Sequence, residues 1–265
     1  MKAKFYKYQG TGNDFVIFDN RGGEYNSLNT EQVKLLCDRR FGIGGDGLML
    51  LNSHPDYDFE MKYYNADGKE SSMCGNGGRC LVKFAYDMGI VKSTYKFLAV
   101  DGEHEAEVDF DGTVSLKMND VESIQFDDNH FVLNTGSPHY VELAENVMKL
   151  DVFNKGRQIR YSNAFSEKGI NVNFVEQTDE PDQIIVRTYE RGVEDETFSC
   201  GTGVTAAAIV CHHNDTGFNR VEVKTKGGDL SVEYDKIGDS YKNIWLSGPA
   251  EKVFEGEIEI KSLEK

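Results

Sequence analysis

The chain has 265 residues, which is enough for one large domain or two domains of moderate size, each with a substantial core. Hydrophobic residues make up 39% and aromatic residues 11% of the chain, a composition typical of folded globular proteins. Asp and Glu (45) outnumber Lys and Arg (29), giving a net charge of −16. Such a surface repels phosphate backbones and anionic lipids, so we expect neither nucleic acid nor membrane as a partner.

The first residues, MKAKFYKYQGTGNDF, contain no apolar segment followed by a cleavage site. No uncharged apolar run approaches the ~18–20 residues that a membrane-spanning helix needs. The cysteines are odd in number and far apart, which favours reduced thiols over a disulfide framework; they are Cys37, Cys74, Cys80, Cys200 and Cys211. These features predict a cytoplasmic protein.

Three segments of the first half recur in the same order in the second half. The first set is GTGNDFVIF (10–18), GIGGDGLMLLN (42–52) and KYYNADGKESSMCGNGG (62–78). The second set is TGSPHYVEL (135–143), GINVNFVEQ (169–177) and RTYERGVEDETFSCGTG (187–203). Each set predicts a strand, then a second strand entered through a glycine, then a polar loop that leads into a Cys-Gly-x-Gly turn. The order predicts an internal duplication into halves at residues 1–119 and 120–250.

A helix-like segment follows each Cys-Gly-x-Gly turn. Residues 204–211 carry no charge on any face, which predicts a helix enclosed on all sides by a sheet. The first helix carries Arg79 and Lys83, so we expect it to be less enclosed. Hairpin-like strands with DG and GG turns come next, HEAEVDFDGTVSLKM and VEVKTKGGDLSVEYD. We therefore predict an α+β fold of two pseudo-symmetric domains, each a curved mixed or antiparallel sheet around a central helix.

Cys74 and Cys200 are each expected at the N-terminus of one of these helices. Glycines let the backbone N–H groups approach a ligand, and these groups and the helix dipole favour a carboxylate or a thiolate. Two such sulfurs in related halves can face opposite sides of one atom. One thiolate can then remove a proton from a carbon while the opposing thiol donates one, which inverts the stereocentre.

Other sites receive less support from the sequence. We interpret Cys37, Cys80 and Cys211 as structural residues in apolar segments. No metal site is predicted, because the adjacent His212 and His213 point in different directions on a helix. No Cys-x-x-Cys redox motif is present, and GIGGDG lacks the Lys-Ser/Thr of a phosphate loop.

The segments NADGKESSMCGNGGRC, YERGVEDETFSCGTG and GPAEKVFEGEI closely resemble the diaminopimelate epimerase family, and the resemblance covers nearly the whole chain. It implies interconversion of LL- and meso-diaminopimelate without pyridoxal phosphate or any other cofactor, for lysine and peptidoglycan precursor synthesis. It further implies an active site between the two domains, a homodimer, and a last strand, about residues 251–265, that returns to the first domain.

The same resemblance assigns roles to individual residues. Cys74 and Cys200 match the acid and base, and Gly75, Asn76, Gly201 and Thr202 match residues whose N–H groups hold the reacting carboxylate. Residues matching those that bind the substrate's amino and carboxylate groups, including those of the far, non-reacting centre, are Asn13, Asn65, Asn171, Glu190 and Arg191. His139 and Glu190 match residues that tune the thiols.

Two departures from the family pattern bear on these roles. Ser137 stands where the family often has Asn, which predicts a substrate contact that is lost or made through water. The acidic segment VEDE (193–196) also puts the positions of Glu190 and Arg191 in question. Two other functions remain open. One is a proline or hydroxyproline racemase, for which Cys-Gly-His rather than Cys-Gly-Asn is typical, and the other is a non-catalytic thiol redox switch.

Overall fold

The computed structural model describes residues 1–213 and 215–260. Its contacts divide the chain into two compact units. Unit 1 comprises Met1–Leu116 together with the segment that begins at Pro249, and unit 2 comprises Lys117–Gly248. Residues 261–265 of the expected last strand lie outside the described residues.

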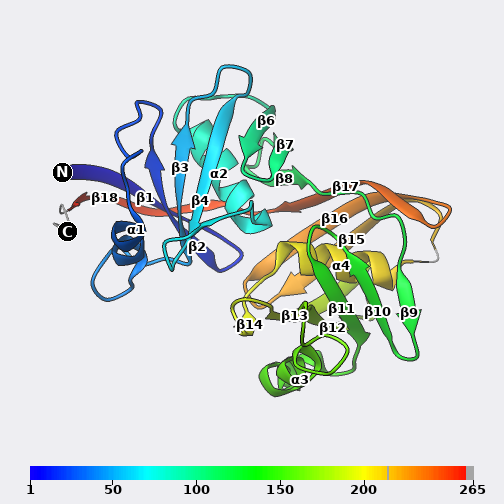
Figure 1. Cartoon of the computed structure of the whole chain (residues 1–265). Coiled ribbons are helices and arrows are strands. Elements are labelled where there is room, and N and C mark those ends of the chain that lie inside the picture. Colours follow the sequence, from blue (N-terminus) through cyan, green and yellow to red (C-terminus); the bar gives the residue numbers. More distant parts are fainter. Residues whose placement is uncertain (214, 261–265) are drawn as a thin grey trace. The chain divides into compact units, whose positions relative to one another are not determined.

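Unit 1 contains a mixed sheet (Figure 1). Its elements are β1 (Lys2–Gly10), β2 (Asn13–Asp19), α1 (Thr30–Cys37), β3 (Gly47–Asn52), β4 (Phe59–Asn65), β5 (Glu70–Ser71), α2 (Gly75–Asp87), β6 (Thr94–Ala99), β7 (Gly102–Val108), β8 (Val114–Lys117) and β18 (Glu251–Glu259). The strands pair in the order β18-β1-β2-β3-β4-β6-β7-β8, with β5 also beside β4. The pairs β2–β3 and β4–β6 are parallel, and the others are antiparallel.

Unit 2 repeats this arrangement. Its elements are β9 (Gln125–Asp127), β10 (His130–Asn134), β11 (Pro138–Leu143), the 3-10 helix η1 (Val147–Lys149), α3 (Val152–Arg160), β12 (Asn171–Gln177), β13 (Gln183–Glu190), β14 (Asp195–Thr197), α4 (Gly201–Cys211), β15 (Gly217–Thr225), β16 (Gly228–Ile237) and β17 (Ser240–Gly248). The strands pair in the order β9-β10-β11-β12-β13-β15-β16-β17, with β14 also beside β13. The parallel pairs, β11–β12 and β13–β15, occupy the positions of β2–β3 and β4–β6. The predicted duplicated α+β fold is confirmed.

Strands β2 and β3 are buried on both faces, which explains their continuous apolar runs. Successive side chains of a strand point to opposite faces of the sheet. Phe18 packs in a cluster with Val33 of α1 on one face. Phe15 and Met49 lie beside Gly77 of α2 on the other face. A helix therefore covers each face of the sheet in unit 1, and the longer one, α2, carries Cys74 at its N-terminus.

The two central helices are more alike in burial than the sequence predicted. In α4 all residues other than Thr202 and Cys211 are buried and none is charged, as expected for a helix enclosed by a sheet. The expectation that α2 is less enclosed holds for its last turns, where Lys83 is half-buried and Tyr86 and Asp87 are exposed. It is wrong for Arg79, whose side chain is 0% exposed. Its guanidinium turns inward and donates to oxygens of Gly75, Asn76 and Thr11. The polar atoms of an arginine need not reach water when the structure supplies acceptors.

Candidate active site

Cys74 is the N-cap residue of α2, as predicted. Its sulfur accepts the backbone N–H of Gly77 at 3.4 Å, and its carbonyl accepts the N–H of Gly78 at 2.7 Å. The first backbone N–H groups of an α-helix have no partner within the helix. In α2 these groups belong to Gly75 and Asn76, the two residues that follow Cys74. The N-terminus of α2 therefore brings the Cys74 sulfur and several backbone N–H donors together.

The predicted residues Asn13 and Asn76 lie beside this cysteine. Asn13 Oδ1 lies 3.7 Å from Cys74 Sγ and accepts a hydrogen bond from Asn76 Nδ2 at 3.4 Å. Asn76 Oδ1 in turn accepts from Arg79 Nη2 at 2.9 Å. The carboxamides of β2 and α2 are therefore oriented by one hydrogen-bonded chain that begins at a buried guanidinium.

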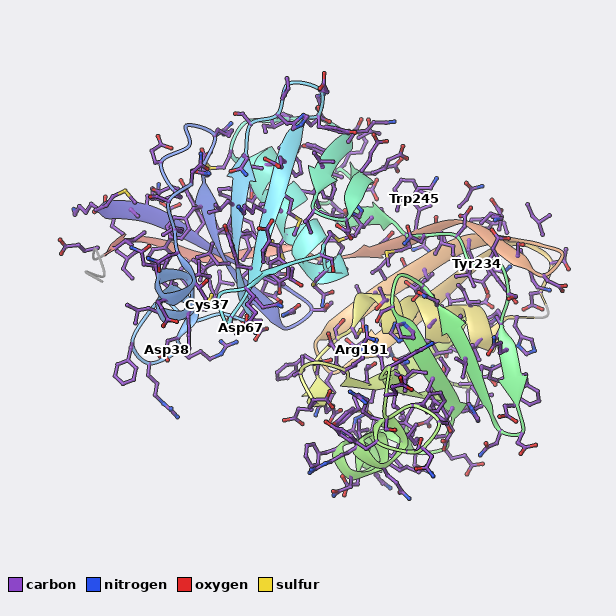
Figure 2. All side chains as sticks on the ribbon, viewed as in Figure 1. Cys37, Asp38, Asp67, Arg191, Tyr234 and Trp245 are labelled. Carbon is purple, nitrogen blue, oxygen red and sulfur yellow. The ribbon has the colours of Figure 1, made fainter. Side chains whose placement is uncertain are left out.

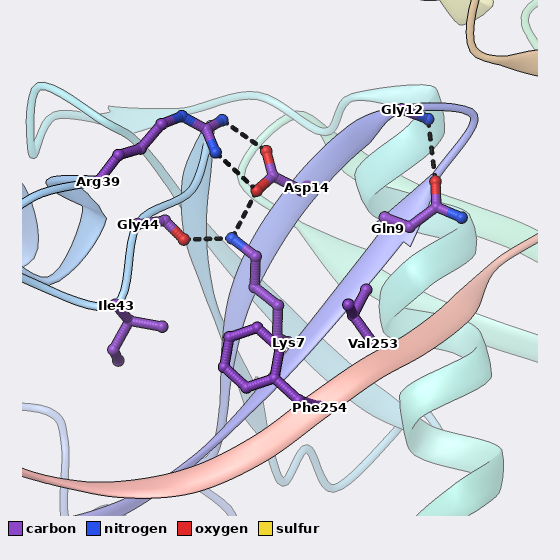
Figure 3. A pocket seen from close by; sticks show the side chains of 9 residues that line it. All are labelled: Lys7, Gln9, Gly12, Asp14, Arg39, Ile43, Gly44, Val253 and Phe254. Carbon is purple, nitrogen blue, oxygen red and sulfur yellow. Dashed lines mark hydrogen bonds and ion pairs between the residues drawn. The ribbon is translucent and has the colours of Figure 1, made fainter.

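The other end of Asn13 is held by a network of ion pairs. Asn13 Nδ2 donates to Asp46 Oδ2 at 2.6 Å, and Arg39 bridges Asp46 and Asp14. Figure 3 shows Arg39 and Lys7 converging on Asp14. These three residues line a cavity of about 530 Å³. Burial alone would raise the pKa of Asp14, but hydrogen bonds from Arg39 and Lys7 hold it well below its usual range. The segment GIGGDG, predicted to be a turn entering a strand, thus also supplies Asp46.

Cys200 occupies the equivalent position in unit 2. It is the N-cap residue of α4 and is 8% exposed. Its sulfur lies 3.5 Å from Thr202 Oγ1, and its carbonyl accepts the N–H of Val204 at 2.8 Å. The backbone carbonyl of Thr202 accepts a hydrogen bond from Thr135 Oγ1 at 2.8 Å, which fixes the first turn of α4 against the segment before β11.

Three polar residues of unit 2 form a second cluster. Asn171 Nδ2 donates to Ser137 Oγ at 2.9 Å, and Asn171 Oδ1 accepts the backbone N–H of Arg191 at 2.9 Å. Arg191, labelled in Figure 2, donates through Nη2 to Ser137 Oγ at 3.3 Å and through Nη1 to the Lys168 carbonyl at 3.1 Å. The short side chain of Ser137 is therefore an acceptor for Asn171 and Arg191, and its own hydroxyl proton remains to be donated.

His139 lies in the core of unit 2. It is 0% exposed, and burial together with the charge of Arg191 lowers its pKa to about 3. Asn173 Nδ2 donates to the Tyr140 carbonyl at 2.9 Å and lies 3.1 Å from His139 Nδ1. Because an amide nitrogen has only hydrogens to offer, His139 Nδ1 is the acceptor and the imidazole proton is on Nε2. His139 is neutral at physiological pH.

The remaining predicted residues lie at strand ends. Asn65 is the exposed last residue of β4, and the next amide, of Ala66, donates to the Asp46 carbonyl at 3.1 Å. Glu190 ends β13, and its carbonyl accepts the N–H of Glu194 at 2.8 Å. Within each unit the predicted residues therefore gather around the start of the central helix and the neighbouring strand ends.

The acidic segment 193–196 forms the turn between β13 and the start of β14. Glu194 accepts the Gly192 N–H at 3.1 Å and the Tyr189 hydroxyl at 3.2 Å. Glu196 accepts two hydrogen bonds from Arg187, at 2.6 and 2.8 Å. The segment is thus bound to its own strands, and it leaves the Arg191–Asn171 hydrogen bond in place.

Burial governs the cysteines that we interpreted as structural. Burial raises the pKa of Cys37 and Cys211 to about 12 and that of Cys80 well above its usual range. They remain thiols at neutral pH. Across residues 1–213 and 215–260, no three His, Cys, Asp or Glu side chains gather as ligands for a metal ion. No helix in the same part of the chain is long and apolar enough to span a membrane.

Four residues of these networks were not identified from the sequence. Arg79, Asp46, Thr135 and Asn173 contact candidate site residues but do not match a substrate-binding position. For Asn173 a signal existed, because the strand segment INVNF places two asparagines in an otherwise apolar run. For Asp46 the signal was a charged residue within a glycine-rich turn.

Comparison with known proteins agrees with the resemblance found in the sequence. The profile described as Diaminopimelate epimerase matches residues 5–124 and 131–253, one segment in each half. A curated Diaminopimelate epimerase of Flavobacterium psychrophilum is 51% identical over 256 residues, covering 96% of this chain and 100% of the relative. One of Chlorobaculum tepidum is 44% identical, covering 94% of this chain and 98% of the relative.

Solved structures show the same fold at low identity. A phenazine biosynthesis protein of the PhzF family from Bacillus anthracis has a TM-score of 0.75 at 15% identity, covering 98% of this chain and 100% of its own. A probable proline racemase of Agrobacterium radiobacter has a TM-score of 0.70 at 13% identity, covering 98% and 94%. These likenesses establish the fold, while the profile and the curated relatives establish that the chain belongs to the diaminopimelate epimerase family of isomerases.

Proposed function

We propose that this protein converts LL-diaminopimelate to meso-diaminopimelate, with Cys74 and Cys200 as an acid–base pair and without pyridoxal phosphate. The observation that carries the proposal is the equivalence of the two cysteines. Each is the N-cap residue of the central helix of its unit, in halves that share one strand order. A chain with a cysteine at the same position of both halves has the two proton-transfer groups that a two-base inversion requires. Units 1 and 2 are then the N-terminal and C-terminal epimerase halves.

The reaction proceeds by one proton removal and one proton addition at the same carbon. The thiolate of one cysteine takes the α-proton and becomes a thiol, and the electron pair of the broken C–H bond stays on the carbon. The thiol of the other cysteine donates its proton to the opposite face and becomes a thiolate. The charge that develops next to the carboxylate is stabilised by preorganised N–H donors, for which the first amides of α2 and α4 are suited: Gly75, Asn76, Gly201 and Thr202.

The polar cluster of unit 2 suits the far end of the substrate. Diaminopimelate has a second amino group and a second carboxylate, and a guanidinium binds a carboxylate through paired donors. Arg191 is held by Asn171 and Ser137, and Asn13, Asn65 and Glu190 complete the polar set. The Ser137 hydroxyl proton can reach this carboxylate through a water molecule, as expected for a side chain shorter than the Asn that the family often has at this position. His139, which is neutral, and Glu190 tune the thiols in this scheme.

The cellular setting follows from the proposed role. We propose a cytoplasmic homodimer that takes a zwitterionic small molecule and supplies lysine and peptidoglycan precursor synthesis. The support is the family membership together with Cys37, Cys80 and Cys211, which are thiols in the structure. Neither nucleic acid nor a membrane has a place in this reaction.

The proposal is tested with purified, reduced protein in D2O, given LL-diaminopimelate and, separately, L-proline. Loss of the α-proton signal is followed by NMR and the meso product by chiral chromatography. Deuterium in diaminopimelate with formation of the meso isomer, and none in proline, is the expected result. Exchange into proline alone would assign the protein to proline racemisation, and exchange into neither substrate would overturn the proposed function.

A further inference from the structure

Arg79 is a buried cation within unit 1. Its side chain is 0% exposed, on a helix whose other residues in the same turn are also buried. Its guanidinium donates to the Gly75 carbonyl at 3.4 Å, to Thr11 Oγ1 at 3.4 Å and to Asn76 Oδ1 at 2.9 Å. All three acceptors are neutral oxygens. They accept from Nη1 and Nη2, while the buried Nε has no hydrogen-bond partner among the described residues. None of the three acceptors carries a charge to balance that of the guanidinium.

A buried charge is costly unless an opposite charge compensates it, and arginine does not lose its proton in proteins. No carboxylate in the part of the chain that the structure describes lies within ion-pair distance of Arg79. The ionisable groups that act on its charge are Cys80 and Cys74. Burial holds the pKa of Cys80 well above its usual range, so Cys80 stays neutral. Cys74 is left as the group that can supply the negative charge.

Arg79 is also joined to Cys74 by hydrogen bonds. Asn76 accepts from Arg79 and donates to Asn13, and Asn13 Oδ1 lies 3.7 Å from the sulfur. Thr11 has a φ of 48°, a region that β-branched residues rarely adopt, and its hydroxyl contacts both Arg79 and Asn76. A strained residue that completes the contacts of a buried cation indicates a site built for a purpose.

The duplicated half lacks this charge. Arg79 lies five residues after Cys74, and the residue five after Cys200 is Thr205. Thr205 makes the equivalent hydrogen bond, from Oγ1 to the Gly201 carbonyl at 3.0 Å, as Arg79 does to the Gly75 carbonyl. The two helices therefore keep the same contact with the first turn, but only α2 adds a positive charge beneath its cysteine, since α4 carries no charged residue.

We propose that Arg79 is the buried counterion that makes Cys74, and not Cys200, the thiolate of the resting enzyme. The inference rests on the proposed function, in which one cysteine holds a proton and the other does not. Arg79 acts as a positioning and electrostatic residue and does not touch the substrate. In the resting state Cys74 would take the α-proton, and Cys200 would donate the one that replaces it.

Two other groups of charged residues lie on the segments around Cys74. Lys7, Asp14, Arg39 and Asp46 bring two positive and two negative charges to the far side of Asn13. On the loop after β6, Asp101 accepts the Met73 N–H at 3.3 Å and lies 3.2 Å from His104 Nε2. The negative charge of Asp101 disfavours a nearby thiolate and therefore acts against the effect of Arg79. The contact of Cys74 with Asn13 Oδ1 favours the thiol form, but at 3.7 Å it is a long bond to sulfur. A full charge in a buried site outweighs it.

The test measures how the alkylation of each cysteine depends on pH. Reduced protein is treated with iodoacetamide from about pH 5 to about pH 10, and peptide mass spectrometry follows Cys74 and Cys200 in the same sample, because only the thiolate reacts. The rates differ with exposure, but the midpoint of each profile reports the loss of the proton. In the wild type we expect Cys74 to have the lower midpoint. A lower midpoint for Cys200 would overturn the proposal without any variant.

Three variants separate the charge from the structure around it. Arg79→Gln should raise the midpoint of Cys74 by about one pH unit or more and leave that of Cys200 in place. Arg79→Lys keeps the charge and should restore most of the difference. Arg21→Gln removes one positive charge of unit 1 whose partners are Asp19 and the Met88 carbonyl, and it should move neither midpoint. Unchanged midpoints in a folded Arg79→Gln variant would show that Arg79 is only structural.

Two further measurements keep the outcomes distinct. If Arg79→Gln does not fold, Thr11→Ala removes one acceptor of the guanidinium and should shift the Cys74 midpoint in the same direction by less, while Thr11→Ser should not. The alkylation profile needs no substrate, so it is independent of the epimerase assay. If the alkylation midpoint of Cys74 is lower than that of Cys200 but the protein does not epimerise diaminopimelate, only the proposed function is overturned. If the protein epimerises diaminopimelate but the two midpoints are equal, only this inference is overturned.

Discussion

The carboxamide of Asn171 holds the backbone of Arg191 by a hydrogen bond. Its Oδ1 accepts the Arg191 backbone N–H at 2.9 Å, while its Nδ2 donates to Ser137 Oγ, which also accepts from the guanidinium. One side chain of β12 thus holds both the backbone and, through Ser137, the tip of the residue that follows β13. The position of the guanidinium is set before any ligand arrives, which lowers the cost of binding a carboxylate.

Asn171→Ala should therefore weaken substrate binding more than it slows the chemical step. The variant loses three hydrogen bonds, to Ser137, Pro138 and Arg191. We expect kcat/KM to fall about 10- to 100-fold, mainly through a higher KM. Steady-state kinetics with LL-diaminopimelate measures the change. Asn154→Ala, on the exposed side of α3, is the control and should keep wild-type kinetics. A fall in kcat at constant KM would contradict the assigned role.

Cys74→Ala and Cys200→Ala should each abolish epimerisation. Each removes one of the two proton-transfer groups, and general acid–base catalysis contributes about 10²- to 10⁴-fold per group. Formation of meso-diaminopimelate by chiral chromatography is the measurement. Cys37→Ala is the matched control, since Cys37 is a buried structural thiol, and it should remain active. Appreciable turnover by either of the first two variants would rule out the two-base mechanism.

Gly203 and Gly77 occupy the same position in the two central helices but should respond differently to alanine. A Cβ on Gly203 would lie 2.3 Å from Asn173 Oδ1, whereas the nearest atom to a Cβ on Gly77 is Met49 Sδ at 3.4 Å. We expect Gly203→Ala to destabilise the protein by about 1–3 kcal/mol. Gly77→Ala should be neutral or stabilising by up to about 1 kcal/mol, through helix propensity. Urea unfolding of both variants checks the contrast, and equal effects would contradict the packing.

The neutral state of His139 makes the protein sensitive to acid. Its pKa is lowered to about 3 in the folded chain by burial and by the charge of Arg191, against about 6.5 when unfolded. When folding lowers a pKa, the resulting stability is fully present above the pKa of the unfolded chain. It is lost as the pH falls toward the pKa of the folded chain. Between about pH 7 and about pH 5 the loss should reach about 2 kcal/mol.

His139→Gln removes this titration. The difference in the free energy of unfolding between the wild type and this variant should therefore shrink by about 2 kcal/mol over the same pH range. Urea titrations at both pH values provide the measurement. Parallel pH profiles for the two proteins would show that His139 does not change its protonation on unfolding.

Much of the fold follows from the sequence because the repeated features are local. The Cys-Gly-x-Gly turns, the apolar helix after Cys200 and the DG and GG hairpins each have a pattern that short-range physics determines. The helix α1 was not predicted, although Asn29 and Gln32 form a capping box. Eight residues are too few for a helix to be stable by its own propensity. The helix is stabilised by packing of Val33, Leu36 and Cys37 against β2 and β3.

The candidate site was less predictable wherever its contacts join distant segments. Arg79 was expected at a helix surface because arginine is rarely buried without a carboxylate. Its acceptors, Thr11 and Asn76, become its neighbours only when β1, β2 and α2 pack together. The sharing of Ser137 by Asn171 and Arg191 likewise depends on the register of β11, β12 and β13. Such contacts are properties of the fold, and no local pattern encodes them.

The pairing of β18 with β1 joins segments that lie far apart in the chain, since Lys2 is opposite Glu259. Unit 2, by contrast, is formed by one continuous stretch, Lys117–Gly248. The sheet of unit 1 therefore depends on a strand that follows unit 2 in the chain, whereas unit 2 contains all of its own strands. Removal of the β18 segment would leave one edge of β1 unpaired without taking a strand from unit 2.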